Sequence, residues 1–298
     1  MLVAGIGQCS LDYLALVDAW PEADTKEEVL LWEEQGGGPV ATALAALSRL
    51  GVRCRFAGVA GDDPEGEKIR RSLEAEGVEA PGLIVRPGAS SQTAFIVVER
   101  GTARRTIFWR RPSGRPLAPG ELPAGFLEGS SFLLLDGLME EVSMHAAGEA
   151  RRLGVPVMLD AGRVREKTVA LAGLSDYVVG SEEFARGLGW SGEAEGFKKT
   201  ASGLCPGVVT ITLGERGSVT YAGGEVLRQG AFPVEAVDST GAGDVFHGGY
   251  VYGLLRGWGL RETLRFASAL AAMKCTRLGG RAGIPGLAGV EAFLRERG

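Results

Sequence analysis

The second half of the chain alternates short apolar runs with stretches of helical periodicity. The runs at 132–136 and 155–160 have the length of buried strands, and 140–153 repeats its apolar residues at helical spacing. The same order continues with a strand, a helix and a strand at 177–179, 181–188 and 208–212. Strands that alternate with helices in this way favour a largely parallel sheet with helices on both faces.

The first half carries more strands than such an order can use. Residues 2–6 and 53–59 predict two core strands, and 65–76 predicts an amphipathic helix. Further strands, the last two forming a hairpin, are expected at 11–18, 28–33, 93–100 and 105–111. We interpret these strands as a small β-sheet lid, formed by about 11–34 and 92–111 and inserted into a single domain that spans 1–298.

The stretch 237–250 has the pattern of a helix that begins at an anion site. Gly241, Ala242 and Gly243 have almost no side chain, and helical periodicity follows them. Such a turn leaves backbone N–H groups free for phosphate oxygens. Asp244, in the first turn, is placed to take a hydroxyl proton while the amides neutralise a transferring phosphoryl group. Because a helix N-terminus favours the carboxylate anion, we expect Asp244 to be a weak base.

This stretch also carries a family resemblance. Residues 238–246 resemble the C-terminal signature of ribokinase-like (PfkB) carbohydrate kinases, Asp-Thr-Thr-Gly-Ala-Gly-Asp-x-Phe, with Ser239 at the first Thr position. The resemblance implies an ATP-dependent sugar kinase that phosphorylates a primary hydroxyl, with Asp244 as the general base and the amides of 241–243 as the anion hole. It also implies a three-layer α/β sandwich with a mostly parallel central sheet. The lid would cover the sugar and join two copies in a homodimer.

A second glycine-rich stretch precedes the helix predicted after the first lid strands. Gly36, Gly37 and Gly38 let a ligand approach the backbone closely. They resemble the family's N-terminal signature, whose glycines lie under the sugar, although the Asn further into that motif is replaced near residues 41 and 42. Asp12, just past the first strand, matches the position at which family members hold sugar hydroxyls.

Two more stretches resemble the nucleotide side of the family. Thr212, Gly214 and Gly217 follow a strand rich in β-branched residues, and the resemblance implies that their loop lies along ATP. Lys274 and Gly279 belong to a glycine-rich segment that matches the second wall of the adenine site.

The family's magnesium motif is incomplete in this sequence. Ser181 stands where many members have the Asn of Asn-x-x-Glu, and Phe184 stands where they have the Glu. The resemblance assigns part of the magnesium and phosphate role to Glu182, with Ser181 near ATP. Mg²⁺ is expected to arrive with ATP, held mainly by phosphates and water. The use of a monovalent cation such as K⁺ stays open.

Basic residues suggest an acceptor with an anionic group. Those best placed to reach it are three on the lid and one after the strand that ends at residue 160: Lys26, Arg110, Arg111 and Arg163. Residues 265–285 resemble sulfofructose kinases, whereas 108–113 resemble 2-keto-3-deoxygluconate kinases. The acceptor therefore stays open among fructose-like ketoses, sulfofructose and sugar acids.

Composition limits the cellular environments and the classes of binding partner that we expect for the protein. The net charge of −5 gives no general attraction to nucleic acid or to an anionic membrane. The four cysteines are scattered, which argues against a disulfide framework or zinc site and fits a reducing cytoplasm. The N-terminus lacks a basic flank and a cleavage motif, so a signal peptide is not expected.

Two other functions remain to be weighed. The chain contains no Gly-Lys pair, which excludes a Walker A loop, and no His-Arg-Asp loop. A nucleoside kinase of the same superfamily is disfavoured by the basic residues near the acceptor. A sugar-binding regulator without turnover is suggested by the missing Asn-x-x-Glu but opposed by the intact 241–244 stretch.

Overall fold

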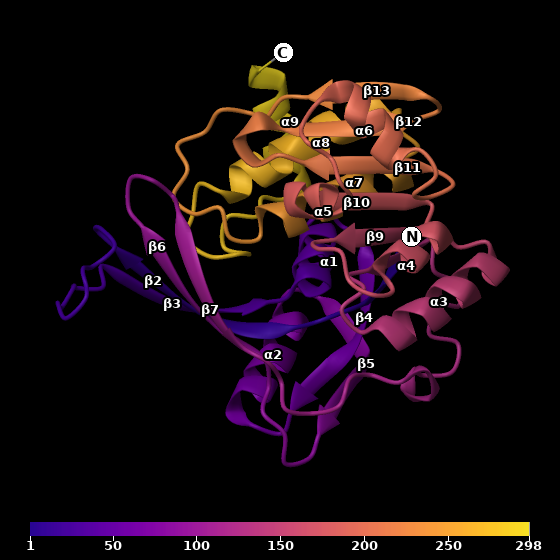
Figure 1. Cartoon of the computed structure of the whole chain (residues 1–298). Helices are drawn as coiled ribbons and strands as arrows, with labels where there is room; N and C mark the ends of the chain where they lie inside the picture. The colour runs from indigo at the N-terminus through magenta and orange to yellow at the C-terminus, as the bar shows by residue number, and fades with distance from the viewer. Residues whose placement is uncertain (298) are drawn as a thin grey trace.

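Residues 1–297 form two sheets in the computed structural model of the chain, which describes these residues apart from the side chains of residues 194 and 195. The larger sheet has nine strands in this part of the chain, in the order β13-β12-β11-β10-β9-β8-β1-β4-β5 (Figure 1). Their bounds are β1 Leu2–Ile6, β4 Arg53–Gly61, β5 Val78–Arg86, β8 Phe132–Leu135, β9 Val157–Ala161, β10 Tyr177–Ser181, β11 Val208–Thr212, β12 Ser218–Ala222 and β13 Glu225–Gln229. Only the pairs that include β12 are antiparallel, so the predicted mostly parallel sheet is confirmed.

Helices cover both faces of the larger sheet. One face carries α1 Pro39–Arg49, α2 Pro64–Ala75, α7 Ala242–Leu255, α8 Leu260–Lys274 and α9 Leu287–Glu296. The other carries α3 Glu140–Leu153, α4 Thr168–Leu174, α5 Glu182–Gly187 and α6 Ala194–Ala201. Successive strand residues point to opposite faces, so Val3 of β1 joins the first apolar cluster while Ala4 and Ile6 join the second. The result is the expected three-layer α/β sandwich.

The strand order creates a switch point beside β1. The chain adds β4 and β5 on one side of β1, and it later adds β8, β9, β10 and β11 on the other side. The connections that leave the carboxyl ends of β1 and β8 therefore diverge. Open α/β sheets bind ligands outside the carboxyl ends of the strands at such a point.

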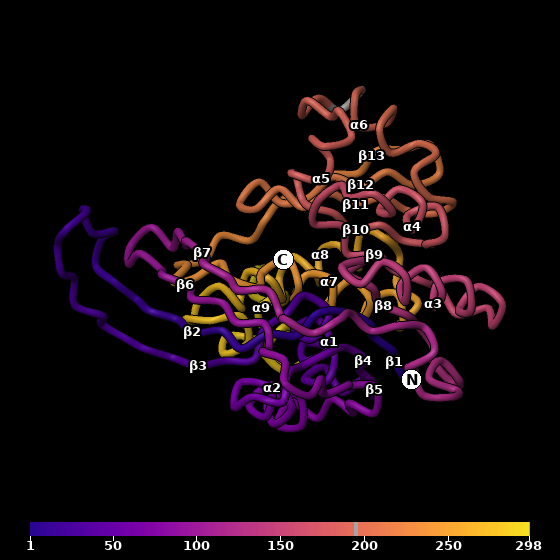
Figure 2. Tube along the Cα trace, turned by 60° about the horizontal axis from the view of Figure 1, so that its bottom comes forward, coloured from indigo at the N-terminus to yellow at the C-terminus, as the bar shows by residue number. Residues whose placement is uncertain are grey.

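A second, four-stranded sheet projects from the body of the molecule, and its hairpins extend to the left in Figure 2. Its order is β3-β2-β6-β7, with bounds β2 Ser10–Val17, β3 Leu31–Gly37, β6 Thr93–Glu99 and β7 Arg105–Arg110. The hairpin expected at 93–111 is present as β6 and β7. In contrast to the expected strand at 28–33, β3 begins at Leu31 and includes Gly36 and Gly37.

The two faces of the small sheet differ in what they carry. Asp12, Ala94 and Trp109 are aligned across β2, β6 and β7 on one face, here called the inner face. This face packs through Leu14 and Ile96 against Leu278, which follows α8. The next residues along the three strands, Tyr13, Phe95 and Phe108, are aligned on the opposite, outer face.

Several elements did not follow from the sequence. The strand β5 was not expected, because Pro81 and Gly82 interrupt its apolar pattern, and it lies at the edge of the sheet. The antiparallel edge formed by β12 and β13 was also not expected. No helix in the described residues 1–297 is both long and apolar enough to cross a membrane.

Candidate active site

Carboxylates gather where the strands around the switch point end. Asp136 directly follows β8, and its side chain accepts hydrogen bonds from the N–H groups of Gln8 (2.7 Å) and Leu138 (2.9 Å). Asp160 lies near the end of β9, the next strand along the sheet. Asp244, at the start of α7, is close enough to both carboxylates to affect their ionisation.

The start of α7 forms a cradle of backbone N–H groups. Gly241 precedes the helix with φ 72° and ψ 3°, a left-handed conformation that glycine adopts at little cost. The N–H of Ala242 donates to the Ser239 carbonyl (3.2 Å), whereas those of Gly241 and Gly243 have no hydrogen-bond partner within residues 1–297. These free donors lie at the positive end of the helix dipole, which suits them to bind phosphoryl oxygens.

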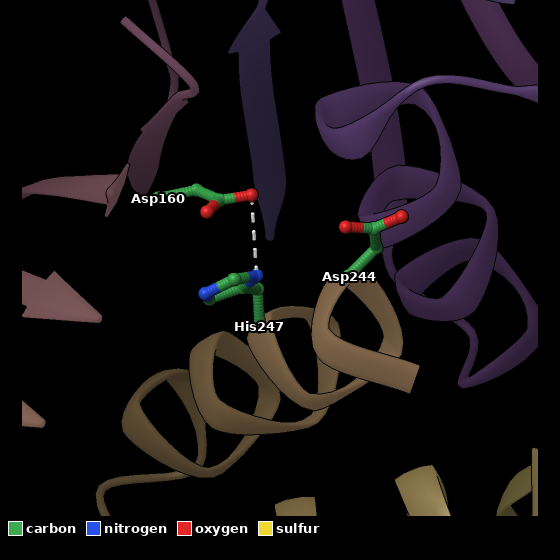
Figure 3. Close-up of side chains that lie close together, drawn as sticks. All are labelled: Asp160, Asp244 and His247. Atoms are coloured by element: carbon green, nitrogen blue, oxygen red, sulfur yellow. Dashed lines mark ion pairs between the residues drawn. The ribbon is translucent and has the colours of Figure 1, made fainter. Parts of the chain in front are cut away.

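Asp160, Asp244 and His247 converge on one point (Figure 3). One potential ligand atom from each of these residues lies within 4.8 Å of the others. His247 Nε2 is 3.2 Å from the Val179 carbonyl, which can only accept, so Nε2 carries a hydrogen. Nδ1 then faces Asp160 Oδ2 at 3.4 Å, and a proton at that contact can belong to either group. His247 is thus beside the cradle.

The electrostatics of Asp244 differ from the expectation of a weak base. Burial, followed by the negative charge of Asp160, raises the pKa of Asp244 to about 6, and His247 and Arg105 oppose this shift. Burial likewise raises the pKa of Asp160 and that of Asp136 to about 7. The cost of burying neighbouring negative charges therefore outweighs the helix N-terminus, and Asp244 is a stronger base than its sequence position suggests.

Asp12 and the glycine-rich stretch lie side by side. Asp12 is buried on β2, accepts a hydrogen bond from Ser10 Oγ (2.7 Å), and has its pKa raised by burial. Gly37 lies so close that a Cβ there would collide with the Asp12 carboxylate. Gly38 has φ 97°, and Gly36 packs against Ser72. The structure therefore brings Asp12 and these glycines together.

A cavity of about 570 Å³ opens beside the switch point. Gln8, Leu138 and Trp109 contribute to its wall, and four arginines also line it: Arg111, Arg115, Arg163 and Arg165. Arg115 is paired with Glu121 (2.7 Å) and Arg163 with Glu183 (2.9 Å). Arg111 lies over the Trp109 ring and, like Arg165, forms no ion pair in the described residues. A second cavity, of about 440 Å³ between β13 and α8, contains no predicted site residue.

Asp12 and Gly36–Gly38 do not line the 570 Å³ cavity, and neither do two of the four predicted basic residues. Arg110 lies on β7 with the parity of Phe108, on the outer face. Lys26 is exposed in the connection between β2 and β3. The structure instead places Arg105 on the inner face, where its guanidinium donates to Ser239 Oγ (2.6 Å) beside the cradle.

The predicted nucleotide loop follows β11. Thr212 ends that strand and donates to the Gly180 carbonyl (3.3 Å), and Gly214 and Gly217 bound the next turn. Ser181 caps α5 by accepting from the Phe184 N–H (3.1 Å), and it donates to Gly162 (2.7 Å). The Ser181 hydroxyl is therefore already used by the protein.

Glu182 is held by two guanidinium groups. Its carboxylate oxygens accept from Arg186 (2.7 Å) and from Arg216 (2.5 Å), which belongs to the loop after β11. The Arg216 contact is the main cause of a lowered pKa of Glu182. Direct binding of a metal ion by Glu182 would require these ion pairs to be broken.

Lys274 and Gly279 lie behind the cradle. Lys274 is fully buried, and its Nζ donates to the Asp238 carbonyl (2.8 Å). Gly279 donates its N–H to Asp238 Oδ2 (2.7 Å) and packs against Gln35 of β3. The Lys274 side chain thus points into the protein.

A C-terminal arginine joins this segment to the acceptor side. Arg281 is buried, and its guanidinium donates to Ser72 Oγ (2.9 Å) and to the Gly37 carbonyl (3.2 Å). The sequence interpretation assigned no role to Arg281, nor to Asp136 and Asp160. The signal available for the two acids was their position directly after apolar strand runs.

The sandwich, its four-stranded sheet and the N–H cradle beside Asp244 define the class of ribokinase-like sugar kinases. The chain belongs to the pfkB family carbohydrate kinases, which it matches over residues 2–286. It is accordingly an ATP-dependent carbohydrate kinase.

Individual relatives span nearly the whole chain. A nucleoside kinase from Methanothermobacter thermautotrophicus is 29% identical over 94% of this chain and 91% of that protein. An ATP-dependent ribose-1-phosphate kinase from Halopiger xanaduensis is 28% identical over 99% of this chain and 98% of that protein. The structure matches a ribokinase from Thermotoga maritima with a TM-score of 0.83 at 25% identity, covering 99% of both chains.

Proposed function

We propose that the protein transfers the γ-phosphoryl group of ATP to a primary hydroxyl of a ketose or sugar acid that carries an anionic group. The supporting observation is that the arginine-lined cavity adjoins the Asp244 cluster. Asp136 links them, because it binds Gln8 and Leu138 of the cavity and lies near Asp160 and Asp244. An acceptor whose anionic group binds the arginines would present its other end to Asp244.

The chemistry assigned to these residues is proton removal and charge stabilisation. Asp244 takes the proton of the attacking hydroxyl, and the free N–H groups of Gly241 and Gly243 bind the oxygens of the transferring phosphoryl group. Asp12 holds acceptor hydroxyls. The small sheet acts as a lid whose inner face excludes water from the reaction.

The residues present fit an ATP-borne Mg²⁺ that is held mainly through phosphate oxygens and water. Mg²⁺ supplies positive charge to the phosphate oxygens during transfer. Because Glu182 is engaged by Arg186 and Arg216, we assign it to holding the loop of Arg216 against ATP. Thr212, Gly214, Gly217, Ser181 and Gly279 contribute backbone surface to the same nucleotide site.

The test is ADP release by the purified protein with Mg-ATP, using ketoses, sugar acids, sulfofructose, sugar phosphates and nucleosides as acceptors. We expect turnover on an anionic sugar. Asp244→Asn keeps the size of the side chain and removes the base, so kcat should fall by about 10²- to 10⁴-fold while ATP binding is retained. Glu141→Gln, an exposed change on α3, is the control. Undiminished turnover in Asp244→Asn would refute the assigned base.

A nucleoside kinase is the second candidate, because the Methanothermobacter relative carries that name. A nucleoside has no anionic group for Arg111 and Arg165, which is why we rank it lower. Turnover on nucleosides alone would favour the nucleoside kinase over the kinase of anionic sugars. ATP binding without turnover on any acceptor would favour a sugar-binding regulator.

We also propose a homodimer in a reducing cytoplasm. The outer face exposes an aromatic row of Tyr13, Phe95 and Phe108, and Trp32 packs beside Phe95 with ring centroids 5.4 Å apart. Exposed aromatic surface of this kind is typical of protein interfaces. The cytoplasm is supported by the cysteines, which are all free.

A further inference from the structure

A lysine is buried directly behind the anion cradle, where the proposed reaction gives it no part. Lys274 ends α8, has no exposed surface, and donates from Nζ to the Asp238 carbonyl at 2.8 Å. Removing an ammonium group from water is costly unless it is paired and hydrogen-bonded. The free-energy cost of burying the Lys274 ammonium suggests that this group does more than fill space.

The surroundings connect this ammonium to the cradle. The Asp238 side chain is buried and accepts at Oδ1 from the Thr240 N–H (2.8 Å) and hydroxyl (2.7 Å). Gly279 donates to Oδ2 of the same carboxylate. The Cys275 carbonyl accepts from the N–H groups of Val237 (2.8 Å) and Asp238 (3.1 Å). The end of α8 thus holds the loop that leads into the free N–H groups.

Burial and charge act in opposite directions on Lys274. Burial lowers the pKa of Lys274, and the charge of Asp238 opposes this shift by favouring the protonated amine. The developing negative charge of a phosphoryl group would lie on the other side of the 238–241 loop. A positive charge behind that loop stabilises this charge through the low-dielectric interior.

An exchangeable K⁺ does not fit behind this loop. Such an ion binds through carbonyl oxygens, and the Lys274 ammonium, which has the same unit charge, already lies 2.8 Å from the Asp238 carbonyl, at the position such an ion would take. The segment after Lys274 leaves little room, because even a Cβ at Gly283 would collide with the Lys274 carbonyl.

We propose that Lys274 is a built-in monovalent cation, which positions the 238–241 loop and charges the anion cradle so that phosphoryl transfer needs no added K⁺. Lys274 is a positioning residue in this account, since it acts through the loop. The proposal rests on the proposed kinase function for its effect on turnover, but its effect on cation binding can be measured without an acceptor.

The first experiment uses the wild-type protein. Turnover and the thermal unfolding midpoint are measured in KCl, NH₄Cl and tetramethylammonium chloride at equal ionic strength. We expect both quantities to be the same in the three salts. A midpoint or turnover that rises specifically with K⁺ would overturn the proposal, because it would reveal an exchangeable cation.

The second experiment replaces the ammonium. Lys274→Ala leaves space beside the Asp238 carbonyl, so NH₄⁺ or K⁺ should raise its unfolding midpoint over that in tetramethylammonium, as expected for a ligand that binds the folded state. Turnover should fall by about tenfold or more, the scale of a coupling worth ~1.4 kcal/mol, and should recover with NH₄⁺. Lys198→Ala, on the surface of α6, is the matched control and should respond to neither salt.

The remaining outcomes of the Lys274→Ala experiment also test the proposal. A folded Lys274→Ala protein that responds to no cation would mean that Lys274 only fills space, and the proposal fails. If Lys274→Ala does not fold, Lys274→Met and the wild-type salt comparison replace it. If no acceptor gives turnover, the proposed function fails, while the midpoint measurements still test the cation site.

Discussion

At the residue scale, three acids share a small volume at the end of the sheet. Asp136, Asp160 and Asp244 are each raised in pKa mainly by burial, and the charge of one acid further opposes ionisation of its neighbours. A base at the reacting hydroxyl benefits, because a carboxylate with a pKa of about 6 holds a proton more firmly than an exposed one. The cluster therefore tunes Asp244 to its proposed role.

This tuning predicts a pH dependence. Asp244 must be deprotonated to act as a base, so kcat/KM should fall as pH decreases through about 6 and level off above it. Asp160→Asn removes a negative charge that raises the Asp244 pKa, so the midpoint of the profile should move to lower pH. The profile is measured with saturating Mg-ATP, and Glu141→Gln serves as the control. A shift of the midpoint to higher pH would contradict the coupling.

Sequence and structure contribute differently at this scale. The sequence was enough to propose a role for Asp244, because the small residues that make the cradle are its immediate neighbours in the chain. Asp136 and Asp160 could not be placed beside it, because their meeting depends on the order of β8 and β9 in the sheet. The expected weak base was not borne out for a related reason, since the burial of Asp244, which mainly raises its pKa, and the charge of Asp160 both depend on how distant segments pack.

At the scale of elements, the alternation of side chains along each strand gives the small sheet two different faces. Arg105, Ile107 and Trp109 of β7 lie on the inner face, whereas Phe108 and Arg110 lie on the outer face. The sequence showed that β7 was rich in arginine and aromatic residues but not which of them lie on the inner face. A shift of one residue in the register of β7 would exchange its two faces. Only the pairing of β7 with β6 therefore decides which side chains lie on the inner face.

The alternation predicts different roles for two neighbouring arginines. Arg111→Ala should raise KM for an anionic acceptor by about 10- to 150-fold, the range of a charge-assisted hydrogen bond worth ~1.5–3 kcal/mol. KM for a neutral ketose should change much less. Arg110→Ala, on the outer face, tests the alternative directly. A larger effect at Arg110 than at Arg111 would mean that the outer face meets the acceptor.

At the scale of the whole molecule, the βα rhythm was enough to predict the mostly parallel sheet. That rhythm is local, because each apolar run and each amphipathic helix is continuous in sequence. The antiparallel edge of β12 and β13, and β5 with its Pro81 and Gly82, were missed. The strands β13 and β5 lie at the two edges of the sheet and pair on one side only, so their patterns are weaker than those of the central strands.

The exposed outer face predicts the state of assembly. Phe108 is 54% exposed in the aromatic row, and burial of that row between two copies would favour a dimer. Phe108→Glu places a charge there and should shift sedimentation from dimer to monomer. Val169→Glu, an exposed apolar position on α4, is the control. A monomeric wild-type protein at all concentrations would contradict the proposed homodimer.

Arg281 also bears on how the molecule matures during synthesis. It follows all the strands and the cradle in the chain, yet its guanidinium holds the Gly37 carbonyl beside Asp12. The loop of Gly36–Gly38 is therefore synthesised well before the arginine that binds it. A chain that ends before residue 281 has Asp12 and Asp244 but lacks the hydrogen bond that holds the Gly37 carbonyl.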